Sequence, residues 1–494
     1  MTRYVAAGVV VLTLVVAAGC PSNSQLSRPP PVQQFYFPTG IVHVASSASS
    51  DGWLFVANAN FDKRFVGGSV TTVDLSRVGL PTFGQPVVGA PPQLTALGID
   101  DAGVALISSF SGEMTALALD DRRVRLFIPS RSEGMKFHAL DATLPATSGA
   151  PVVLSCSTPS GDGPNDCATN APSLSPRATE YSTTGLPRAP GPFGVGVGVH
   201  ACDALRACSV GRCEQGRCVQ DGAGGVEPVA DVFVTHITQA DSPTGSTLNT
   251  RGYLVKLDAT QPTVTDSAFI DIGPGASSSV VVGRRFAFVT GRFISTATNL
   301  LRIVDTASLA TSTPRVLTPT LPPFTEARGL ALSSDERRLY MAMRGPDALL
   351  VAVIDDPEAP QPVLQPLCRG EECGITLPSS PNSVQAISRP GARDLVLVTC
   401  SGNGGSLAFY DDQTGTLATE IIGVGLTPFG IAVDRRGAGA RVYVSNFDDG
   451  RIAVIDVPDL AAPSGARLVA HLGDQQLCLT QGLRNPQLCD GGVR

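Results

Sequence analysis

Residues 441–457 read RVYVSNFDDGRIAVIDV. Two runs of alternating apolar residues flank a polar Asn-Phe-Asp-Asp-Gly segment, which is the pattern of a β-hairpin. The same layout occurs at residues 53–75, with a longer turn, and at residues 338–355. The hairpin is therefore one copy of an internal repeat, and the repeat decides the fold.

Seven copies are recognisable because the second strand of each ends in an aspartate. These residues are Asp74, Asp141, Asp258, Asp305, Asp355, Asp411 and Asp456. The last five lie 45 to 56 residues apart, which is the size of a four-stranded propeller blade. Most copies also have a strand before the hairpin, opened by Pro-Phe-Gly or Gly, and a fourth strand after it.

The repeat predicts an all-β fold, a seven-bladed β-propeller with four-stranded antiparallel blades over residues 36–473. Two points stay open in the early copies. Residues 90–111 could form a separate strand pair, and Pro129 fits a central strand poorly because it lacks a backbone N–H. The strand-ending aspartates are expected to start turns and to pair with the arginine pairs at 122–123, 284–285, 337–338 and 435–436.

The N-terminus has the composition of an export signal. Arg3 precedes an uninterrupted small and apolar stretch over residues 5–19, and Cys20 follows. The ending Ala-Ala-Gly-Cys resembles the lipobox of bacterial lipoproteins, which implies a signal peptide over 1–19 and lipidation at Cys20. A cleavable signal with an incidental Cys is the alternative, and the run is short for a membrane-spanning helix.

The Pro-rich residues 20–35 are predicted to tether the propeller to the membrane. Pro21 is not the Asp that retains many lipoproteins in the inner membrane. By analogy, the chain is expected at the outer membrane, facing the periplasm or the cell surface. The net charge is only −7 and the arginines are scattered or paired, so nucleic acid is not an expected partner.

Eleven further cysteines indicate an oxidising compartment. Ten are local neighbours and disulfide candidates: Cys156 with Cys167, the group Cys202, Cys208, Cys213 and Cys218, Cys368 with Cys373, and Cys478 with Cys489. They fall mainly in insertions over 157–191 and 200–229 and in a C-terminal tail over 474–494. Zinc is the alternative for 202–218, although structural zinc sites use closer Cys pairs. Cys400 is expected to be a buried free thiol.

The repeat resembles a known family. Val-Tyr-Val-Ser-Asn at 442–446 and Ile-Ala-Val-Ile-Asp at 452–456 look like the YVTN repeat of bacterial β-propellers, and Phe55-Val56-Ala57-Asn58 is a looser match. With the lipobox and the cysteine insertions, the chain resembles the YVTN-type propeller lipoproteins of myxobacteria. Related propellers include lactonases, quinoprotein-like subunits and binding scaffolds, so the resemblance predicts the fold and not the activity.

In propellers of this kind, the loops between the second and third strands of each blade lie around one mouth of the central channel. This implies a ligand-binding ring at that mouth, formed by Asn58, Asp62, Arg131, His236, Arg344, Asn446 and Asp448. Asn and Asp also simply form tight turns. Arg131 and Arg344 are less easily explained in that way and are the preferred contacts.

Motifs for covalent haem, zinc proteases, serine hydrolases and phosphate loops are missing from the sequence. No catalytic residue, metal or cofactor is predicted. The favoured interpretation is a non-catalytic binding or scaffold protein for a protein or glycan partner at the cell envelope. The alternative is a lactonase-like hydrolase, which requires His236 to converge with Asp62, Asp448 or Asp449. A redox subunit carries little weight.

Overall fold

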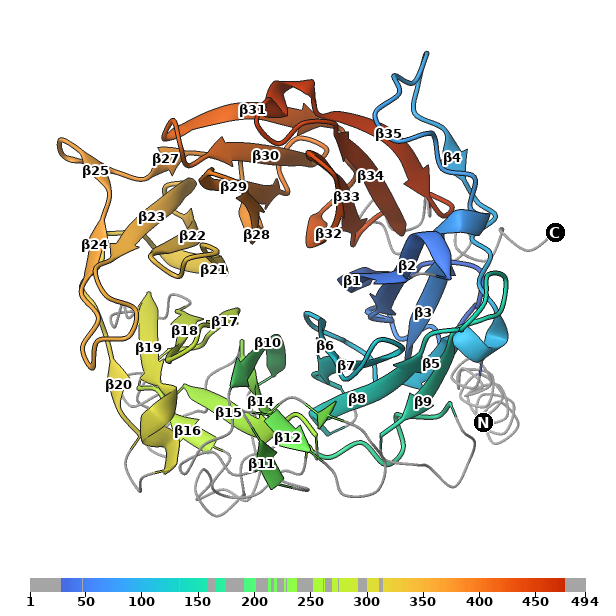
Figure 1. Ribbon diagram of the computed structural model, residues 1–494, viewed down its shortest axis with the longest axis horizontal. Coiled ribbons are helices and arrows are strands. Elements are labelled where there is room, and N and C mark those ends of the chain that lie inside the picture. The colour runs from blue at the N-terminus through green and yellow to red at the C-terminus, as the bar shows by residue number, and fades with distance from the viewer. Residues whose placement is uncertain are drawn as a thin grey trace, which may run out of the picture.

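A computed structural model describes residues 28–475, apart from 47, 133, 158–164, 175–190, 201–211, 215–216, 220–225, 228, 238–251, 261, 263–268, 274, 292–299 and 311–313. For residues 212–214, 217–219, 226–227 and 310 only the backbone is described. The chain forms seven antiparallel sheets arranged in a ring around one axis (Figure 1). The predicted seven-bladed, four-stranded β-propeller is confirmed.

Each blade runs from an innermost to an outermost strand in chain order. The first three blades are β1 (Pro38–Ser46), β2 (Ser49–Asn58), β3 (Gly68–Asp74) and β5 (Val104–Ile107); β6 (Thr115–Ala118), β7 (Arg123–Ser130), β8 (Lys136–Thr143) and β9 (Val153–Cys156); and β10 (Pro192–His200), β14 (Val229–His236), β15 (Tyr253–Asp258) and β16 (Phe269–Asp271).

The next two blades are β17 (Val280–Val282), β18 (Phe286–Thr290), β19 (Leu301–Asp305) and β20 (Val316–Leu317); and β21 (Glu326–Leu332), β22 (Arg338–Arg344), β23 (Ala348–Ile354) and β24 (Leu364–Pro366). The last two are β28 (Pro381–Arg389), β29 (Ala392–Cys400), β30 (Ser406–Asp411) and β31 (Thr416–Ile422); and β32 (Pro428–Arg436), β33 (Gly439–Asn446), β34 (Arg451–Val457) and β35 (Arg467–Leu472).

The hydrophobic core lies between neighbouring blades, so the middle strands are apolar on both faces. In β2, Leu54 and Val56 pack against the last blade, in a cluster that includes Tyr443. The alternate residues Trp53 and Phe55 pack against the second blade. This two-sided burial explains why the repeat shows continuous apolar runs in its second and third strands.

Glycines let the innermost strands approach one another closely. A Cβ built on Gly40 would lie 2.4 Å from the Cβ of Met114, and one on Gly430 would lie 2.6 Å from the Thr39 carbonyl oxygen. The register shifts near this position in β1, β10, β21, β28 and β32. The Pro-Phe-Gly and related triplets thus mark a bulge where neighbouring blades touch.

The two early ambiguities are resolved. Pro129 lies in β7, opposite Phe137 of β8. Within residues 90–111, β5 is the outer strand of the first blade, whereas the short β4 (Gln93–Leu94) pairs in parallel with β35 of the last blade. The segment over 81–94 therefore joins the first blade to the last one.

Three smaller β features lie outside the four-stranded blades. The short strands β11 (Arg212–Glu214), β12 (Arg217–Val219) and β13 (Val226–Glu227) form a separate sheet in the third-blade insertion. The two-residue strands β25 (Cys368–Arg369) and β26 (Glu372–Cys373) form a hairpin between the fifth and sixth blades. The strand β27 (Ile375–Thr376) pairs with β23. Among the described residues, no helix is both long and apolar enough to cross a membrane.

Candidate functional site

The loops between the second and third strands and the connections between blades share one face of the ring. The N–H of Phe110, between the first two blades, donates to the Ala59 carbonyl of the β2–β3 loop at 2.6 Å. The Arg131 N–H of the β7–β8 loop in turn donates to the Phe110 carbonyl at 3.2 Å. We call this the mouth face.

Three of the predicted mouth residues lie inside the protein. Asn58 and Asn446 are fully buried; Asn58 accepts the Tyr36 N–H at 3.2 Å, and Asn446 donates to the Val424 carbonyl at 2.8 Å. His236 is also buried, with Nδ1 3.2 Å from the Tyr253 carbonyl oxygen. Burial lowers the pKa of His236 to about 4, so its imidazole is neutral at physiological pH.

Three others bind the protein's own chain near the surface. Asp62 forms an ion pair with Arg64 at 2.8 Å, and Asp448 accepts the Thr427 hydroxyl. Arg344 donates to the carbonyls of Pro381 and Ser380 at 2.9 and 3.3 Å, which ties the fifth blade to the sixth.

The carboxylates named for a hydrolase site are held within their own blades. Asp449 is fully buried and binds Arg451 at 2.8 Å, in the β33–β34 loop of the last blade. Asp62 and Asp448 have the partners given above, in the first and last blades, whereas His236 ends β14 in the third. The structure therefore offers each group a structural partner and gives the hydrolase interpretation no support.

Arg131 is different, because it lies among aromatic rings. Its guanidinium carbon is 6.0 Å from the ring centre of Phe61, 5.8 Å from that of Phe110 and 5.6 Å from that of Phe193. Lys63 lies 5.2 Å from the Phe110 ring centre. These distances are those of cation–π contacts.

Two of the rings around Arg131, those of Phe61 and Phe110, belong to a larger group, the rim aromatic cluster, which consists of Phe37, Phe61, Phe110 and Phe447. Ring centres are 4.9 Å apart for Phe61 and Phe110, 5.4 Å for Phe61 and Phe447, and 5.1 Å for Phe37 and Phe447. Phe61 is 45% exposed although it contacts three other rings. An exposed aromatic side chain held by packed neighbours is a typical anchor for a binding partner.

Two members of the rim aromatic cluster have unusual backbone conformations. Phe37 and Phe110 have φ angles of +50° and +59°, in the left-handed region that glycine prefers. For a bulky residue this conformation is strained, and such strain concentrates at functional sites. Glycine would adopt these φ angles with less strain, so the two phenylalanines are candidates for a functional role of their rings.

Below the cluster, two phenylalanines meet across the ring axis. Phe193 begins the innermost strand of the third blade and Phe429 that of the last, yet their ring centres are 5.6 Å apart. The Arg131 guanidinium lies over Phe193 and so connects this pair to the rim aromatic cluster. The pair therefore covers the channel at the mouth face.

Arg131 is predicted from the sequence, whereas the aromatic residues around it are not. The signal is present in Asn-Phe-Asp, which occurs both at 60–62 and at 446–448, and in Pro-Phe-Gly at 192–194 and 428–430. Taken locally, both triplets indicate only a turn or the start of a strand. Their phenylalanines converge only because seven blades close into a ring.

The described cysteines pair locally. Cys156 is bonded to Cys167 and Cys368 to Cys373, while Cys400 is a buried free thiol whose pKa is raised to about 12 by burial. The side chains of Cys213 and Cys218, which face each other in β11 and β12, are not described. Cys20, Cys202, Cys208, Cys478 and Cys489 lie outside the described residues.

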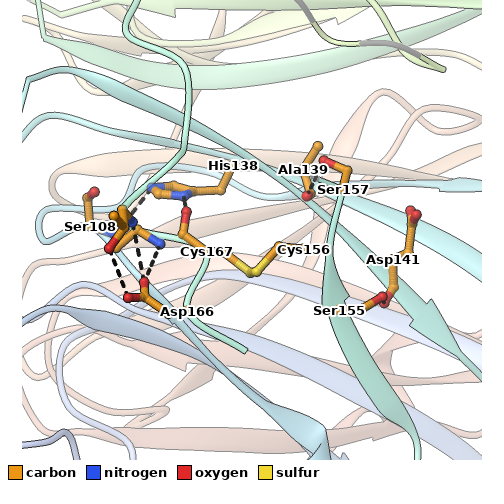
Figure 2. The surroundings of a disulfide bond; sticks show 11 residues. Ser108, His138, Ala139, Asp141, Ser155, Cys156, Ser157, Asp166 and Cys167 are labelled. Carbon is orange, nitrogen blue, oxygen red and sulfur yellow. Dashed lines mark hydrogen bonds between the residues drawn. A yellow bond between two sulfur atoms is a disulfide. The ribbon is translucent and has the colours of Figure 1, made fainter. Parts of the chain in front are cut away.

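The Cys156–Cys167 disulfide braces two blades (Figure 2). Cys156 ends β9 of the second blade, whereas residues 165–167 run along β5 of the first, where the Leu106 N–H donates to the Asn165 carbonyl at 2.8 Å. His138 lies beside the disulfide and holds the Cys167 carbonyl with Nδ1 at 3.1 Å. The insertion is thus fixed to the ring at its base.

The fold and the mouth face define the class of protein, a seven-bladed β-propeller with an aromatic mouth. No protein-family model matches the chain, and no curated protein matches it. Among solved structures it is similar to dihydro-heme d1 dehydrogenase NirN in complex with DHE, at 15% identity and a TM-score of 0.41, over 92% of this chain and 66% of that one.

Two further solved structures are similar. Apo AztD from Citrobacter koseri gives 13% identity and a TM-score of 0.37, over 88% of this chain and 86% of that one. The periplasmic gluconolactonase PpgL of Pseudomonas aeruginosa gives 17% identity and a TM-score of 0.37, over 78% and 84%. These likenesses concern the propeller fold, which is shared by proteins of different activities.

Proposed function

We propose that this protein is a non-catalytic binding propeller of the cell envelope. In this proposal the chain is a YVTN-type lipoprotein that is anchored through lipid on Cys20 and binds its partner with the mouth face. Its partner is a protein or a glycan. The observation that carries the proposal is Phe61, which is 45% exposed at the centre of the rim aromatic cluster, with Arg131 against its ring.

The chemistry of the mouth face favours a protein partner. Aromatic and arginine side chains with packed, desolvated surroundings supply most of the binding energy in protein interfaces. A glycan is the second candidate because a sugar ring stacks on an exposed aromatic face, which Phe61 also offers. The insertion over 202–218 is a further candidate contact.

The proposal is tested by affinity capture from solubilised envelopes with the full-length chain as bait. Phe61→Ala is expected to weaken partner recovery roughly 30-fold, corresponding to about 2 kcal/mol, because it removes the exposed anchor. Ile422→Ala is the matched control, since Ile422 is 69% exposed on the outermost strand of the sixth blade. It should leave recovery unchanged.

Mass spectrometry of the captured material and a glycan array with the same two variants separate the two partner classes. A chain lacking residues 202–218 tests the contribution of the insertion. Equal recovery by Phe61→Ala and the unmodified chain would contradict the assignment of the mouth face. A specific catalytic turnover of a lactone by the unmodified chain would contradict the non-catalytic role.

A further inference from the structure

A cavity of about 280 Å³ lies on the ring axis. It is lined by residues of all seven innermost strands and their connections, from Phe429 and Glu113 toward Val197 and Val282. At about 30 Å³ for each water, this volume equals about nine waters. The cavity is therefore large enough for a small organic molecule.

Both apolar side chains and polar groups line the cavity, the latter including Thr115, Ser279, Ser383 and Gln385. Valine, isoleucine and leucine side chains come from six of the seven blades: Ile41, Val195, Val197, Val280, Val281, Val282, Leu330, Val384 and Ile431, together with Met114 of the second blade. Among the described residues that line the cavity, Glu113 alone carries an ionisable side chain. A bound cation would therefore find its counter-charge at Glu113, among apolar side chains and neutral polar groups.

Glu113 is fixed at the level of the Phe193–Phe429 pair. Its N–H donates to the Phe193 carbonyl at 2.8 Å, and its carboxyl group receives hydrogen bonds from the Val195 N–H and the Ser279 hydroxyl. Both donors are neutral. Glu113 as a residue is half-buried, because it borders the cavity. Protein atoms nevertheless desolvate its carboxyl group, and this desolvation raises the pKa of Glu113 to about 8.

Charged side chains on the neighbouring elements have other contacts. Arg328 has, at the start of the innermost strand of the fifth blade, the position that Phe193 has in the third blade. It forms an ion pair with Glu326 at 3.0 Å. The remaining titratable side chains on β1, β7 and β10 are His43, 2.9 Å from the Asp51 carbonyl oxygen; Arg123, paired with Asp120; Arg125, paired with Asp141; and His200, 3.5 Å from Asp231. The groups that act on the Glu113 carboxyl are thus the two neutral donors.

We infer that the central cavity binds a small organic ammonium ion, with Glu113 as its counter-ion. The apolar side chains among the lining residues suit the carbon substituents of such a cation, and Phe429 adds an aromatic ring at one end. A divalent metal ion fits less well, because it prefers several charged oxygen ligands and Glu113 is the one carboxylate among the described residues that line the cavity. The site is separate from the partner surface of the mouth face and does not depend on it.

Binding is coupled to a proton. Below pH 8 the protonated Glu113 carboxyl group must release its proton to solvent when the cation enters, so that a carboxylate faces the ammonium group. Affinity is therefore expected to rise about tenfold for each pH unit up to pH 8 and to level off above it. A neutral ligand of the same shape lacks this dependence.

The experiment is calorimetric titration of the full-length chain with tetramethylammonium chloride between pH 6 and pH 9. Two buffers with different ionisation enthalpies report the proton released, and tert-butanol is the neutral ligand for comparison. Glu113→Gln is expected to weaken tetramethylammonium binding at least tenfold and to abolish its pH dependence. Gln385→Ala is the control, because Gln385 lines the same cavity without a charge and its loss should leave the pH dependence intact.

The proposal is overturned if tetramethylammonium gives no binding at pH 8.5, if its affinity does not change with pH, or if Glu113→Gln binds as the unmodified chain does. Should Glu113→Gln fail to fold, the proton release of the unmodified chain still decides: about one proton at pH 6.5 supports the proposal and none overturns it. Neither result depends on the partner of the mouth face.

Discussion

The strand-ending aspartates show how one repeated residue serves different contacts. Asp258 and Asp411 accept the backbone N–H two residues further on, at 2.7 and 2.8 Å, as expected for turn formers. Asp456 is fully buried and instead binds Arg441, with Nε–Oδ1 at 2.6 Å and Nη2–Oδ2 at 3.1 Å. The repeat conserves the position of the carboxylate while its partner varies.

The predicted partners of these aspartates were only partly right. Of the arginine pairs, Arg285 binds a strand-ending aspartate, Asp305, at 3.3 Å. Arg125 and Arg441 lie within the second strand of the blade and reach the aspartate directly opposite them in the third. Cross-strand neighbours are closer than turn residues, and the alternation of side chains along the strand places the arginine on the same face as the aspartate.

His138 is expected to make stability depend on pH. The Ser108 N–H donates to Nε2 at 3.2 Å and Nδ1 donates to the Cys167 carbonyl, which together require the neutral imidazole (Figure 2). Burial lowers the pKa of His138 to about 4, below the value of about 6.5 in an unfolded chain. Its contribution is therefore complete above pH 6.5 and is lost as the pH falls toward 4.

The measurement is the free energy of unfolding by denaturant, followed by the fluorescence of Trp53, the single tryptophan. Between pH 6.5 and pH 4, the unmodified chain should lose up to about 1.4 kcal/mol per pH unit more than His138→Gln, because the variant lacks this proton. All other titrating groups are common to both chains. Parallel pH curves for the two would refute the assignment.

At the scale of elements, the sequence predicted the strands well because each carries its own pattern. Alternation, turn residues and the final aspartate identify β33 and β34 without knowledge of any other blade. The rim aromatic cluster could not be predicted in this way. Phe61 and Phe447 are 386 positions apart in the sequence, and their ring contact exists only after the last blade meets the first.

Glu113 was missed for a related reason. It follows a Ser-Gly pair in a blade connection and resembles any solvent-exposed loop carboxylate. Its environment is made by Val195 and Ser279, from the third and fourth blades. The position of a lone ionisable group relative to the ring axis is a property of the closed ring, so no local pattern reports it.

The Cys156–Cys167 disulfide is expected to stabilise the contact between the first two blades. It closes a loop with a sequence separation of 11 residues, so replacing both cysteines by serine should cost about 3 kcal/mol of unfolding free energy. The control is the double serine variant of Cys368 and Cys373, whose separation is 5 and which closes a surface hairpin. This change is expected to cost about 2 kcal/mol at most.

Denaturant unfolding under non-reducing conditions, again followed by Trp53 fluorescence, compares the two variants. Trp53 packs in the same core cluster as Cys167, between the first and second blades, and so reports that contact directly. If loss of the hairpin disulfide proved as costly as loss of Cys156–Cys167, the role of the latter as a brace between blades would be wrong.

At the scale of the whole molecule, the first and last blades are joined where the ring closes. The first blade consists of β1, β2, β3 and β5, and the N-terminal strand β4 extends the sheet of β32 to β35 in the last blade. Closure uses the Ser445 hydroxyl, which donates to the Thr39 carbonyl at 2.8 Å, and a shared core. The segment over 81–94 adds an outer strap, because its strand β4 lies beside β35 (Figure 1).

This strap bonds to the buried ion pair of the last blade. The Gly84 N–H donates to Asp456 at 2.9 Å, and Arg441 donates to the Pro81 carbonyl at 2.7 Å. Phe83 lies between two cations, with its ring centre 5.6 Å from the Arg436 guanidinium carbon and 5.7 Å from that of Arg441. Phe83, in the segment between β3 and β5 of the first blade, thus covers the charged groups of Arg436 and Arg441, which would otherwise face solvent where the first and last blades meet.

Phe83→Ala is therefore expected to destabilise the closed ring by about 1–2 kcal/mol, through loss of two cation–π contacts and partial exposure of the Arg441–Asp456 pair. Val88→Ala is the matched control, since Val88 belongs to the same segment but is 98% exposed, and it should change stability by less than about 0.5 kcal/mol. Amide hydrogen exchange should show faster exchange in β4 and β35 for Phe83→Ala, before any other strand is affected. Because β4 of the strap pairs with β35 of the last blade, weakening the strap should loosen this junction first. Uniform acceleration across all seven blades would show instead that the inner contacts alone hold the ring closed.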